Sequence, residues 1–458
     1  MTSMATSQAL RKHLSVTDGF VLYTSAVLGQ SLIALPSIAA RHAGPWSILI
    51  WVALAAVSYP LARIMAELGA RYPSAGGVIA FIGQGLGQPA SWLTGVLYLA
   101  AIAVGGPATA LVFSAYLGTL IPLPGHWPFA VAATLLGALV LGACFDVSRV
   151  MRLQRWGFFV CLAAITVTLL LALPHVTTAR LTDVSGYGLA GVASTGLICF
   201  FAFVGWENAA FSGEEFADPR TLVKALGLAV VAVGALFVLL GITVVGGLSR
   251  SVIATSDASL ADLARLSLGA PATRVAAVIA LALLILFMFT WARSAARLIY
   301  ALAREGLFPR PLARMDAASG APRNAALALG AAWAVALLAQ LVLGVSIERY
   351  IQLSSGDFLL TYVLILLTAW RLLDIRRYLP ALVSASLAIL ALVAAGFQSL
   401  WYALAAAVLF AAIMAARRAY IRLWSRPGAP DARPCHEAAS SASLAAEMER
   451  IVLSRDEV

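Results

Sequence analysis

The sequence predicts an all-α membrane protein with twelve transmembrane helices. Of its 458 residues, 62% are hydrophobic and only 11% are charged, whereas soluble domains average about 45–50% apolar and about 25% charged residues. Polar or charged residues also interrupt two long apolar segments, the first and the sixth, near their middle. Together these observations indicate a polytopic helical protein with a binding site inside the membrane.

Charge and cysteine content exclude several other classes. The net charge of +10 does not indicate a nucleic-acid partner, because the basic residues are scattered in short loops between apolar segments. The four cysteines show no paired spacing, so we expect neither a disulfide set nor a metal site. No cofactor is expected, and the lipid bilayer is the predicted surrounding of the chain.

Twelve segments satisfy the length criterion of about 20 mostly apolar residues for a membrane-spanning helix. They are 17–40, 45–68, 90–121, 128–146, 155–174, 187–212, 224–249, 271–300, 322–344, 349–370, 379–396 and 399–416. No cleavable signal pattern precedes the first of them, which is therefore expected to remain as a helix. Residues 1–16 form a cytoplasmic N-terminal segment in this interpretation, 17–416 the membrane domain, and 417–458 a mobile cytoplasmic tail with one short helix at 441–452.

The distribution of basic residues predicts the orientation in the cell's inner (cytoplasmic) membrane. With the N-terminus inside, all basic residues fall on the cytoplasmic side except six, which are Arg41, Arg180, Arg250, Arg265, Arg274 and Arg349. Cytoplasmic loops carry an excess of Lys and Arg. Both termini are therefore predicted to be cytoplasmic.

The sixth segment contains the strongest functional signal, FFAFVGWENAAFSGEEFADP at residues 200–219. Gly205, Trp206 and Glu207 interrupt its apolar run. A charged side chain at bilayer depth costs roughly 2.5–3.5 kcal/mol and normally faces a partner or a water-filled cavity, and a glycine lets a helix unwind. We predict a broken helix that lines a substrate site. The alternative is a kinked structural helix whose glutamate is satisfied by a neighbouring helix.

The first segment repeats this anomaly at Gly29-Gln30-Ser31, followed by Pro36. An unwound segment here would offer backbone N–H groups to a carboxylate; the alternative is a close helix–helix contact through small and polar residues. Interrupted helices five positions apart are what two inverted five-helix repeats predict. The repeats would span about 17–174 and 187–370, with the site at their interface and two further helices at 379–416.

Asp357 lies about a third of the way into the tenth segment. An intramembrane carboxylate is a functional candidate by default, and a structural, hydrogen-bonded role is the alternative. Glu207 and Asp357 are the candidates for proton coupling.

The sequence resembles the amino acid–polyamine–organocation transporters, and within them the bacterial exporters of neutral amino acids such as methionine and the branched-chain residues. The resemblance covers about residues 14–420. It is carried by LGQSLIALP at 28–36, RYPSAGGVIAFIGQGLG at 71–87, FFAFVGWENAAFSGEEFADPRTLVKAL at 200–226 and AREGLFP at 303–309.

The resemblance implies a LeuT-like fold of two inverted five-helix repeats plus two helices, and a role for each break. Backbone N–H groups of the first break would hold the α-carboxylate of the substrate, and carbonyls of the sixth would hold its α-amino group. Phe201 would close over the substrate, with Trp206 as a second gating residue, and Glu207 matches a glutamate linked to pH response in some members. The implied substrate-binding residues are Leu28, Gly29, Gln30, Ser31, Phe200, Phe201, Ala202, Phe203 and Gly205.

Two departures from the family pattern stand out. The motif of the first helix is usually Gly-Ser/Thr-Gly, and here it is Gly29-Gln30-Ser31. The fifth helix also lacks the lysine whose ammonium replaces a sodium ion in several relatives, so sodium coupling would need hydroxyl ligands such as Thr290 or Ser294.

These features predict a secondary transporter, not an enzyme, that moves neutral apolar amino acids outward by proton-coupled alternating access. No nucleotide-binding motif is present, so an ion gradient, of protons or alternatively sodium, must drive it. The transport alternatives are an uptake permease and an amino acid/polyamine exchanger. A non-transporting amino acid sensor and a membrane-embedded enzyme are the alternatives from other classes, and the five histidines, all at segment ends or in loops, disfavour the enzyme.

Overall fold

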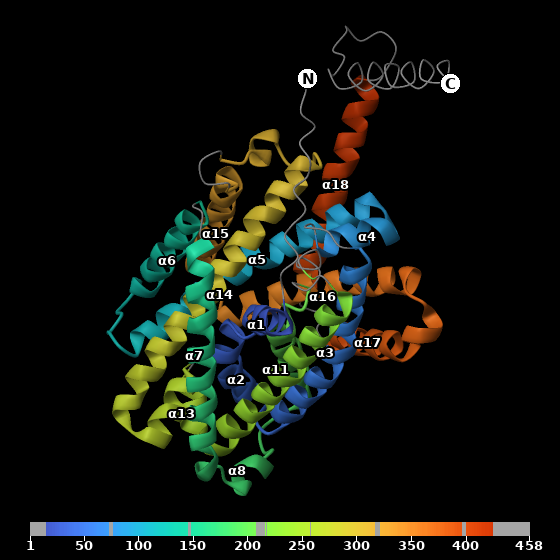
Figure 1. The fold of residues 1–458 in the computed structure, drawn as a ribbon. Helices are drawn as coiled ribbons and strands as arrows, with labels where there is room; N and C mark the ends of the chain where they lie inside the picture. Colours follow the sequence, from blue (N-terminus) through green and yellow to red (C-terminus); the bar gives the residue numbers. More distant parts are fainter. Residues whose placement is uncertain are drawn as a thin grey trace, which may run out of the picture. The chain divides into compact units, whose positions relative to one another are not determined.

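The computed structural model describes residues 15–72, 77–144, 148–207, 216, 218–256, 258–316, 321–395 and 400–424. These residues form helices and no strand, as expected from the composition (Figure 1). Contacts divide the chain into one unit of residues 1–407 and a second of 408–458. The account below concerns the first unit; the described part of the second, residues 408–424, continues the last helix.

Each predicted segment overlaps at least one helix, and the sixth, 187–212, leaves the helix after Phe203 and runs beyond the described residues at 208. The elements are α1 (Val16–Val27), α2 (Gln30–Ala43), α3 (Trp46–Arg71), α4 (Val78–Leu86), α5 (Gln88–Gly118), α6 (Trp127–Ala143), α7 (Ser148–Ala172), η1 (Leu173–His175), α8 (Thr178–Thr182), α9 (Leu189–Phe200), η2 (Phe201–Phe203), α11 (Pro219–Gly247), α12 (Arg250–Thr255), α13 (Ser259–Leu268), α14 (Ala270–Arg304), η4 (Arg310–Ala313), α15 (Arg323–Leu343), α16 (Ile347–Leu372), α17 (Ile375–Ala395) and α18 (Trp401–Trp424). The helix predicted at 441–452 lies outside the described residues.

Seven of these helices are long and apolar enough to cross a membrane, and the bent pair α1 and α2 counts as an eighth. Helices at 127–143, 189–203 and 401–412 are apolar but shorter. The chain is therefore a multi-span helical membrane protein, while twelve crossings and the inverted repeats stay predictions. Helix α18 continues to Trp424, beyond the end predicted at 416.

Short polar residues set several of the helix starts. The Ser15 side chain accepts a hydrogen bond from the backbone N–H of Asp18, whose carboxylate in turn accepts from Ser15. Asp218 caps α11 in front of Pro219, and Ser346 caps α16. These residues satisfy N–H groups that the first helical turn leaves without a partner, so each helix begins at a definite position.

Two groups of packed helices surround the broken segments. Helix α11 packs against α1 and α3, and α5 packs against α4, α6, α14, α15 and α16. Helix α9 contacts α3 of the first group and α16 of the second, and it also contacts α2, which packs on α11. The sixth predicted segment is therefore held between the helices that form the cavity described below and those that support it.

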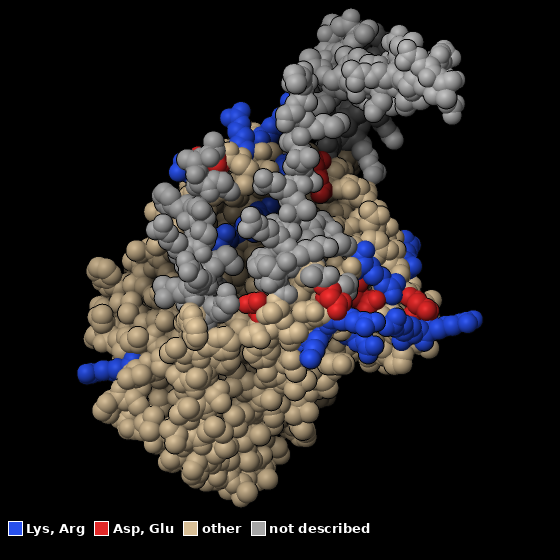
Figure 2. Space-filling view, viewed as in Figure 1, with Lys and Arg blue, Asp and Glu red and all other residues tan. Residues whose placement is uncertain are grey.

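Charged side chains and apolar surface are separated. Figure 2 shows Lys, Arg, Asp and Glu gathered in one band of this face, with a broad region almost free of them below. Large apolar side chains are exposed along several helices, for example Trp156 on α7 and Val342 on α15. Such a surface is what a hydrocarbon environment favours.

Candidate functional site

The first predicted break lies between α1 and α2. Helix α1 ends at Val27, α2 begins at Gln30, and the two axes are bent by 45°. Gly29 has non-helical backbone angles, φ −68° and ψ −115°. A methyl group at this position would come within 2.0 Å of the Phe287 ring of α14. Only a residue without a side chain allows α14 to approach the break this closely.

The second predicted break follows α9. The helix ends at Phe200, continues as the 3₁₀ turn η2, and then turns extended at Val204, where ψ is 135°. Gly205 has φ +133°, a conformation that residues with a side chain rarely adopt. The chain therefore leaves the helix at the point where the sequence places its glycine and its carboxylate.

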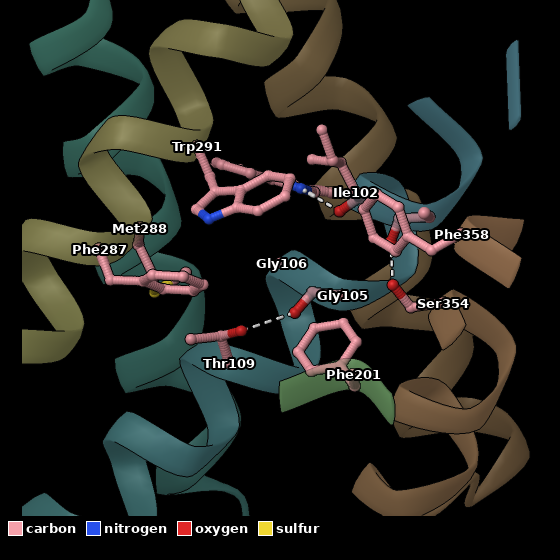
Figure 3. Close-up of a pocket in the computed structure, with 12 residues that line it drawn as sticks. Ile102, Gly105, Gly106, Thr109, Phe201, Phe287, Met288, Trp291, Ser354 and Phe358 are labelled. Atoms are coloured by element: carbon pink, nitrogen blue, oxygen red, sulfur yellow. Dashed lines mark hydrogen bonds between the residues drawn. The ribbon is translucent and has the colours of Figure 1, made fainter. Parts of the chain in front are cut away.

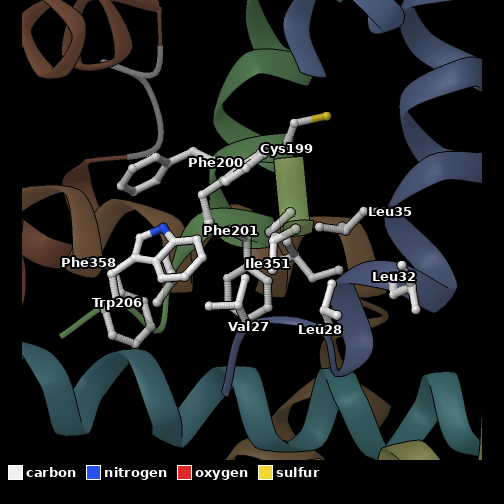
Figure 4. Close-up of a cluster of buried hydrophobic side chains, with 14 of the residues drawn as sticks. Val27, Leu28, Leu32, Leu35, Cys199, Phe200, Phe201, Trp206, Ile351 and Phe358 are labelled. Carbon is white, nitrogen blue, oxygen red and sulfur yellow. The ribbon is translucent and has the colours of Figure 1, made fainter. Parts of the chain in front are cut away.

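The two breaks touch each other. A methyl group on Gly205 would lie 2.8 Å from Cγ2 of Val27 and 2.9 Å from the carbonyl oxygen of Ala26, so the turn after η2 rests on the last turn of α1. Figure 4 shows Val27 and Leu28 in one buried cluster with Phe200, Phe201 and Trp206. The facing arrangement expected from the positions of the two breaks is present.

Glu207 is buried and fully hydrogen-bonded. Its Oε2 accepts from the backbone N–H of Gly205 at 2.9 Å and from the hydroxyl of Tyr362 at 2.9 Å, and its Oε1 accepts from the hydroxyl of Tyr98 at 3.3 Å. Its side chain is only 1% exposed. The carboxylate thus connects the turn after η2 to α5 and to α16. This arrangement agrees with the alternative of a glutamate satisfied by neighbouring helices.

Asp357 of α16 is also completely buried, but unlike Glu207 it has no hydrogen-bond partner for either oxygen of its carboxylate among the described residues. Nearby hydroxyls are directed elsewhere: Ser354 donates to the carbonyl of Ala101, and Thr361 donates to the backbone carbonyl of Asp357 itself. Within the described part of the chain, no side chain or backbone group donates a hydrogen bond to the Asp357 carboxyl group.

A small cavity of about 40 Å³ lies beside the breaks, between α5, α14, α15 and α16 (Figure 3). Its walls are almost entirely apolar, and none of the twelve lining residues is charged. They are Ala101, Ile102, Gly105, Gly106, Thr109, Phe201, Phe287, Met288, Trp291, Trp333, Ser354 and Phe358.

The polar atoms of the wall are mostly occupied. Thr109 donates to the carbonyl of Gly105 at 2.8 Å, Ser354 to that of Ala101 at 2.9 Å, and the indole of Trp333 to that of Ile102 at 2.9 Å. Satisfied hydroxyl and indole groups present little polarity to a ligand. The cavity therefore suits an apolar group.

Aromatic contacts fix the shape of the cavity. Trp291 stacks on Tyr98 with ring centroids 5.9 Å apart, and Phe358 meets both rings edge-on. Phe201 lies edge-on to Phe358, which places it between the second break and α16. Gly106 leaves room for Trp333, since a methyl group there would lie 2.3 Å from the indole nitrogen.

The predicted site residues separate into two sets. Phe201 lines the cavity, whereas the described residues Leu28, Gly29 and Ser31 do not. The first break reaches the cavity only through Phe287, which lines it and packs on Gly29. Leu28 and Ser31 are buried, and the side chain of Gln30 lies outside what the structure describes.

Two of the predicted substrate-binding residues, Phe200 and Phe203, direct their side chains to other neighbours. Phe200 meets the Tyr362 ring edge-on at 5.4 Å, and Phe203 packs between Trp51 and Phe237 at 6.3 and 5.3 Å. These side chains pack α9 and η2 onto neighbouring helices, and the role of their backbone carbonyls in substrate binding stays a prediction. Trp206 is also buried, and its gating role stays a prediction.

The residues that sequence reasoning missed come mainly from α5, α14 and α16. Gly105, Gly106, Trp291 and Phe358 sit in apolar runs where they are indistinguishable from core residues. The Gly105-Gly106-Pro107 sequence was a signal, because adjacent glycines in a membrane helix permit close approach of another group. No group of three His, Cys, Asp or Glu side chains able to hold a metal occurs in the part of the chain that the structure describes.

An ionic cluster ties α2 to α16 at their predicted outer ends. Glu348 accepts from Nη1 of Arg41 at 3.2 Å and pairs with Nε2 of His42 at 3.1 Å. The Arg41 guanidinium also donates to the carbonyls of Ile253 at 3.1 Å and Ser256 at 3.2 Å. The end of the first broken segment is thereby joined to α12 and to the helix that carries Asp357.

Fold and site together define a multi-span helical membrane protein with two broken helices beside a small apolar cavity. The chain belongs to the amino acid permease family, whose model matches residues 14–422. It is 28% identical to the uncharacterised amino acid permease YecA of Bacillus subtilis, over 80% of this chain and 87% of the relative.

Two further relatives are named for the amino acids that they transport. The L-methionine/branched-chain amino acid exporter YjeH of Escherichia coli is 28% identical, over 86% of this chain and 94% of its own. The branched-chain amino acid permease BcaP of Lactococcus lactis is 25% identical, over 75% of this chain and 81% of its own. The resemblance stated from the motifs is confirmed at the level of the family.

Proposed function

We propose that the protein is a secondary transporter that moves neutral apolar amino acids of the methionine, leucine, isoleucine and valine class out of the cell, driven by protons. The observation that carries this proposal is the cavity, whose twelve lining residues include no charge and whose wall contains Phe201 from the second break. A cationic or anionic side chain would lose its hydration there without gaining a partner.

The breaks supply the groups that an amino acid's two charged ends need. The first N–H groups of a helix have no partner within that helix and carry partial positive charge, so the start of α2 at Gln30 and Ser31 suits the α-carboxylate. The chain leaves the helix around Phe201–Phe203, where carbonyls lose their helical N–H partners and suit the α-ammonium group. In this proposal the main chain binds the common part of the substrate and the cavity takes its side chain.

The names of two of the relatives support the same substrate class. YjeH is named as an exporter of methionine and branched-chain amino acids and BcaP as a branched-chain permease. Efflux and proton coupling rest on the likeness to the exporter and on the two buried carboxylates, Glu207 and Asp357.

The test is transport by the purified protein in liposomes. Vesicles loaded with labelled methionine, leucine, isoleucine or valine are expected to release them faster than protein-free vesicles when a proton gradient is applied. Lysine and glutamate are the matched charged substrates and are expected to stay inside. Release of lysine without release of methionine would contradict the proposal. Movement that requires an amino acid on both sides would instead identify an exchanger.

A further inference from the structure

Two buried carboxylates near the cavity differ in their hydrogen bonding, and this difference indicates that they have different roles in transport. Glu207 accepts from two tyrosine hydroxyls and one backbone N–H. Asp357 accepts from no group among the described residues, although it is at least as deeply buried. Both side chains had appeared equivalent as candidates for proton coupling.

The partners of Glu207 favour its charged form. Hydrogen bonds donated to an ionised carboxylate stabilise it relative to the neutral acid. All three donors are held in place by packing: Tyr98 by its stacking on Trp291 of α14, Tyr362 by its contact with Phe200, and Gly205 by its close approach to Ala26 and Val27. Protonation would weaken these three hydrogen bonds, because the neutral acid is a poorer acceptor than the carboxylate. Glu207 is therefore suited to hold the second break in position rather than to exchange a proton in each cycle.

The surroundings of Asp357 favour its neutral form. A buried ionised carboxylate without donors or a cationic partner is strongly destabilised. Tyr402 of α18 lies near enough to Asp357 for an electrostatic interaction, and Tyr350 of α16 lies near Tyr402. Tyr350 donates its hydroxyl to the carbonyl of Ala336 on α15. No lysine, arginine or histidine contributes to the surroundings of Asp357 in the described structure, so the group must carry its own proton here.

Asp357 is also placed where its protonation can affect the cavity. Ser354, one turn before it, and Phe358, directly after it, both line the cavity. Phe358 in turn contacts Phe201, Tyr98 and Trp291. Ionisation of Asp357 would be stabilised by water or by a donor, and in this structure the side chain is fully buried and has no donor among the described residues. A movement of α16 that hydrates Asp357 would therefore displace one wall of the cavity.

We propose that Asp357 carries the coupled proton and that Glu207 is a positioning residue that holds the second break. The proposal rests on the transport function proposed above. The proton binds the Asp357 carboxylate from one side while α16 exposes it to water, stays on it while the group is buried as in this structure, and leaves to the other side when α16 opens again. One proton crosses for each cycle of the substrate site.

The first test uses transport of labelled methionine in liposomes under two regimes. For one coupled proton, a difference of one pH unit supports about a tenfold methionine gradient. Asp357→Asn keeps the shape of the neutral acid, so methionine exchange at equal pH is expected to persist while the tenfold gradient is lost. Glu207→Gln is expected to slow exchange and gradient-driven transport by the same factor, leaving the final gradient unchanged. Ser355→Ala, a buried neighbour whose hydroxyl bonds only within α16, is the control and retains both.

The result that overturns the proposal is a full methionine gradient in Asp357→Asn, or its selective loss in Glu207→Gln. Wild-type protein that exchanges methionine but ignores the pH difference would also refute it while leaving the transport function intact. Absence of methionine movement under every condition would instead reject the transport function.

A second test labels the wild-type protein chemically and does not depend on transport by any variant. Dicyclohexylcarbodiimide is an apolar probe to which a protonated carboxyl group adds across a C=N bond, and the O-acylisourea then rearranges to a stable N-acylurea. Mass spectrometry of peptides from the labelled wild-type protein is expected to find the adduct on Asp357 and not on Glu207. An adduct on Glu207 with none on Asp357 would reverse the assignment, whether or not Asp357→Asn folds.

Discussion

Replacement of Gly205 by alanine tests the contact between the two breaks. At φ +133° a residue with a side chain is strained by about 1–3 kcal/mol. The new methyl group would also lie 2.8 Å from Val27 and 2.9 Å from the Ala26 carbonyl, and overpacking of this kind costs about 1–3 kcal/mol. We expect Gly205→Ala to lower the free energy of unfolding by about 2–6 kcal/mol, measured by unfolding in mixed detergent micelles.

Gly196→Ala is the matched control for this prediction. Gly196 lies in α9, the helix that leads into the same break, and a methyl group there would meet nothing within 4 Å. Because alanine favours a helix more than glycine does, this variant is expected to gain up to about 1 kcal/mol. If Gly205→Ala is as stable as Gly196→Ala, the two breaks do not pack on each other as described.

Three further predictions follow from single contacts. Phe201→Leu is expected to change the KM for methionine severalfold with little loss of stability. Phe203 packs away from the cavity, so Phe203→Leu should lower stability and leave KM unchanged. The reverse pattern would show that the substrate does not bind in this cavity. Glu348→Gln removes the ionic partner of Arg41 and is expected to cost about 1 kcal/mol of unfolding free energy, with no loss meaning that the cluster is not formed in solution. Burial raises the pKa of Asp262, which lies outside the spanning segments, and the opposing effects of Ser256 and Arg265 are smaller. The stabilising contribution of the protonated carboxyl is therefore present at low pH and is lost as the pH rises through the folded-state pKa. Asp262→Asn should be more stable than the wild type at pH 7 but not near pH 4, and a difference in unfolding midpoint that does not change with pH would contradict this.

The sequence predicts the all-helical class and the positions of both breaks, while seven helices and one bent pair are long and apolar enough to span a membrane among the described residues. Long apolar runs define membrane helices because the bilayer sets their length, and a glycine beside a polar or charged residue in such a run has few explanations. Gly29 and Gly205 accordingly occur where the helices stop. The positions of the breaks depend on residues that are neighbours in the sequence, so they can be predicted from one sequence.

The cavity could not be predicted in the same way, because its walls are defined by contacts between distant segments. Phe200, Phe201 and Phe203 are the same residue type in one short stretch, and only the 3₁₀ turn decides that Phe201 alone faces the cavity. The partners of Glu207 lie on α5 and α16, 109 and 155 positions away. Which of two buried carboxylates is satisfied is therefore a property of the packing.

The central claim is that the side chain of a neutral amino acid enters the apolar cavity beside the two breaks. Its most direct test is competition against labelled methionine by alanine, 2-aminobutyrate, norvaline and norleucine, which differ by one methylene at each step. Burial of each methylene is worth about 0.8 kcal/mol, which is about a fourfold gain in affinity per step and about sixtyfold over the series. A steady rise of this size is the expected result; equal affinities across the series would show that the cavity does not receive the substrate side chain.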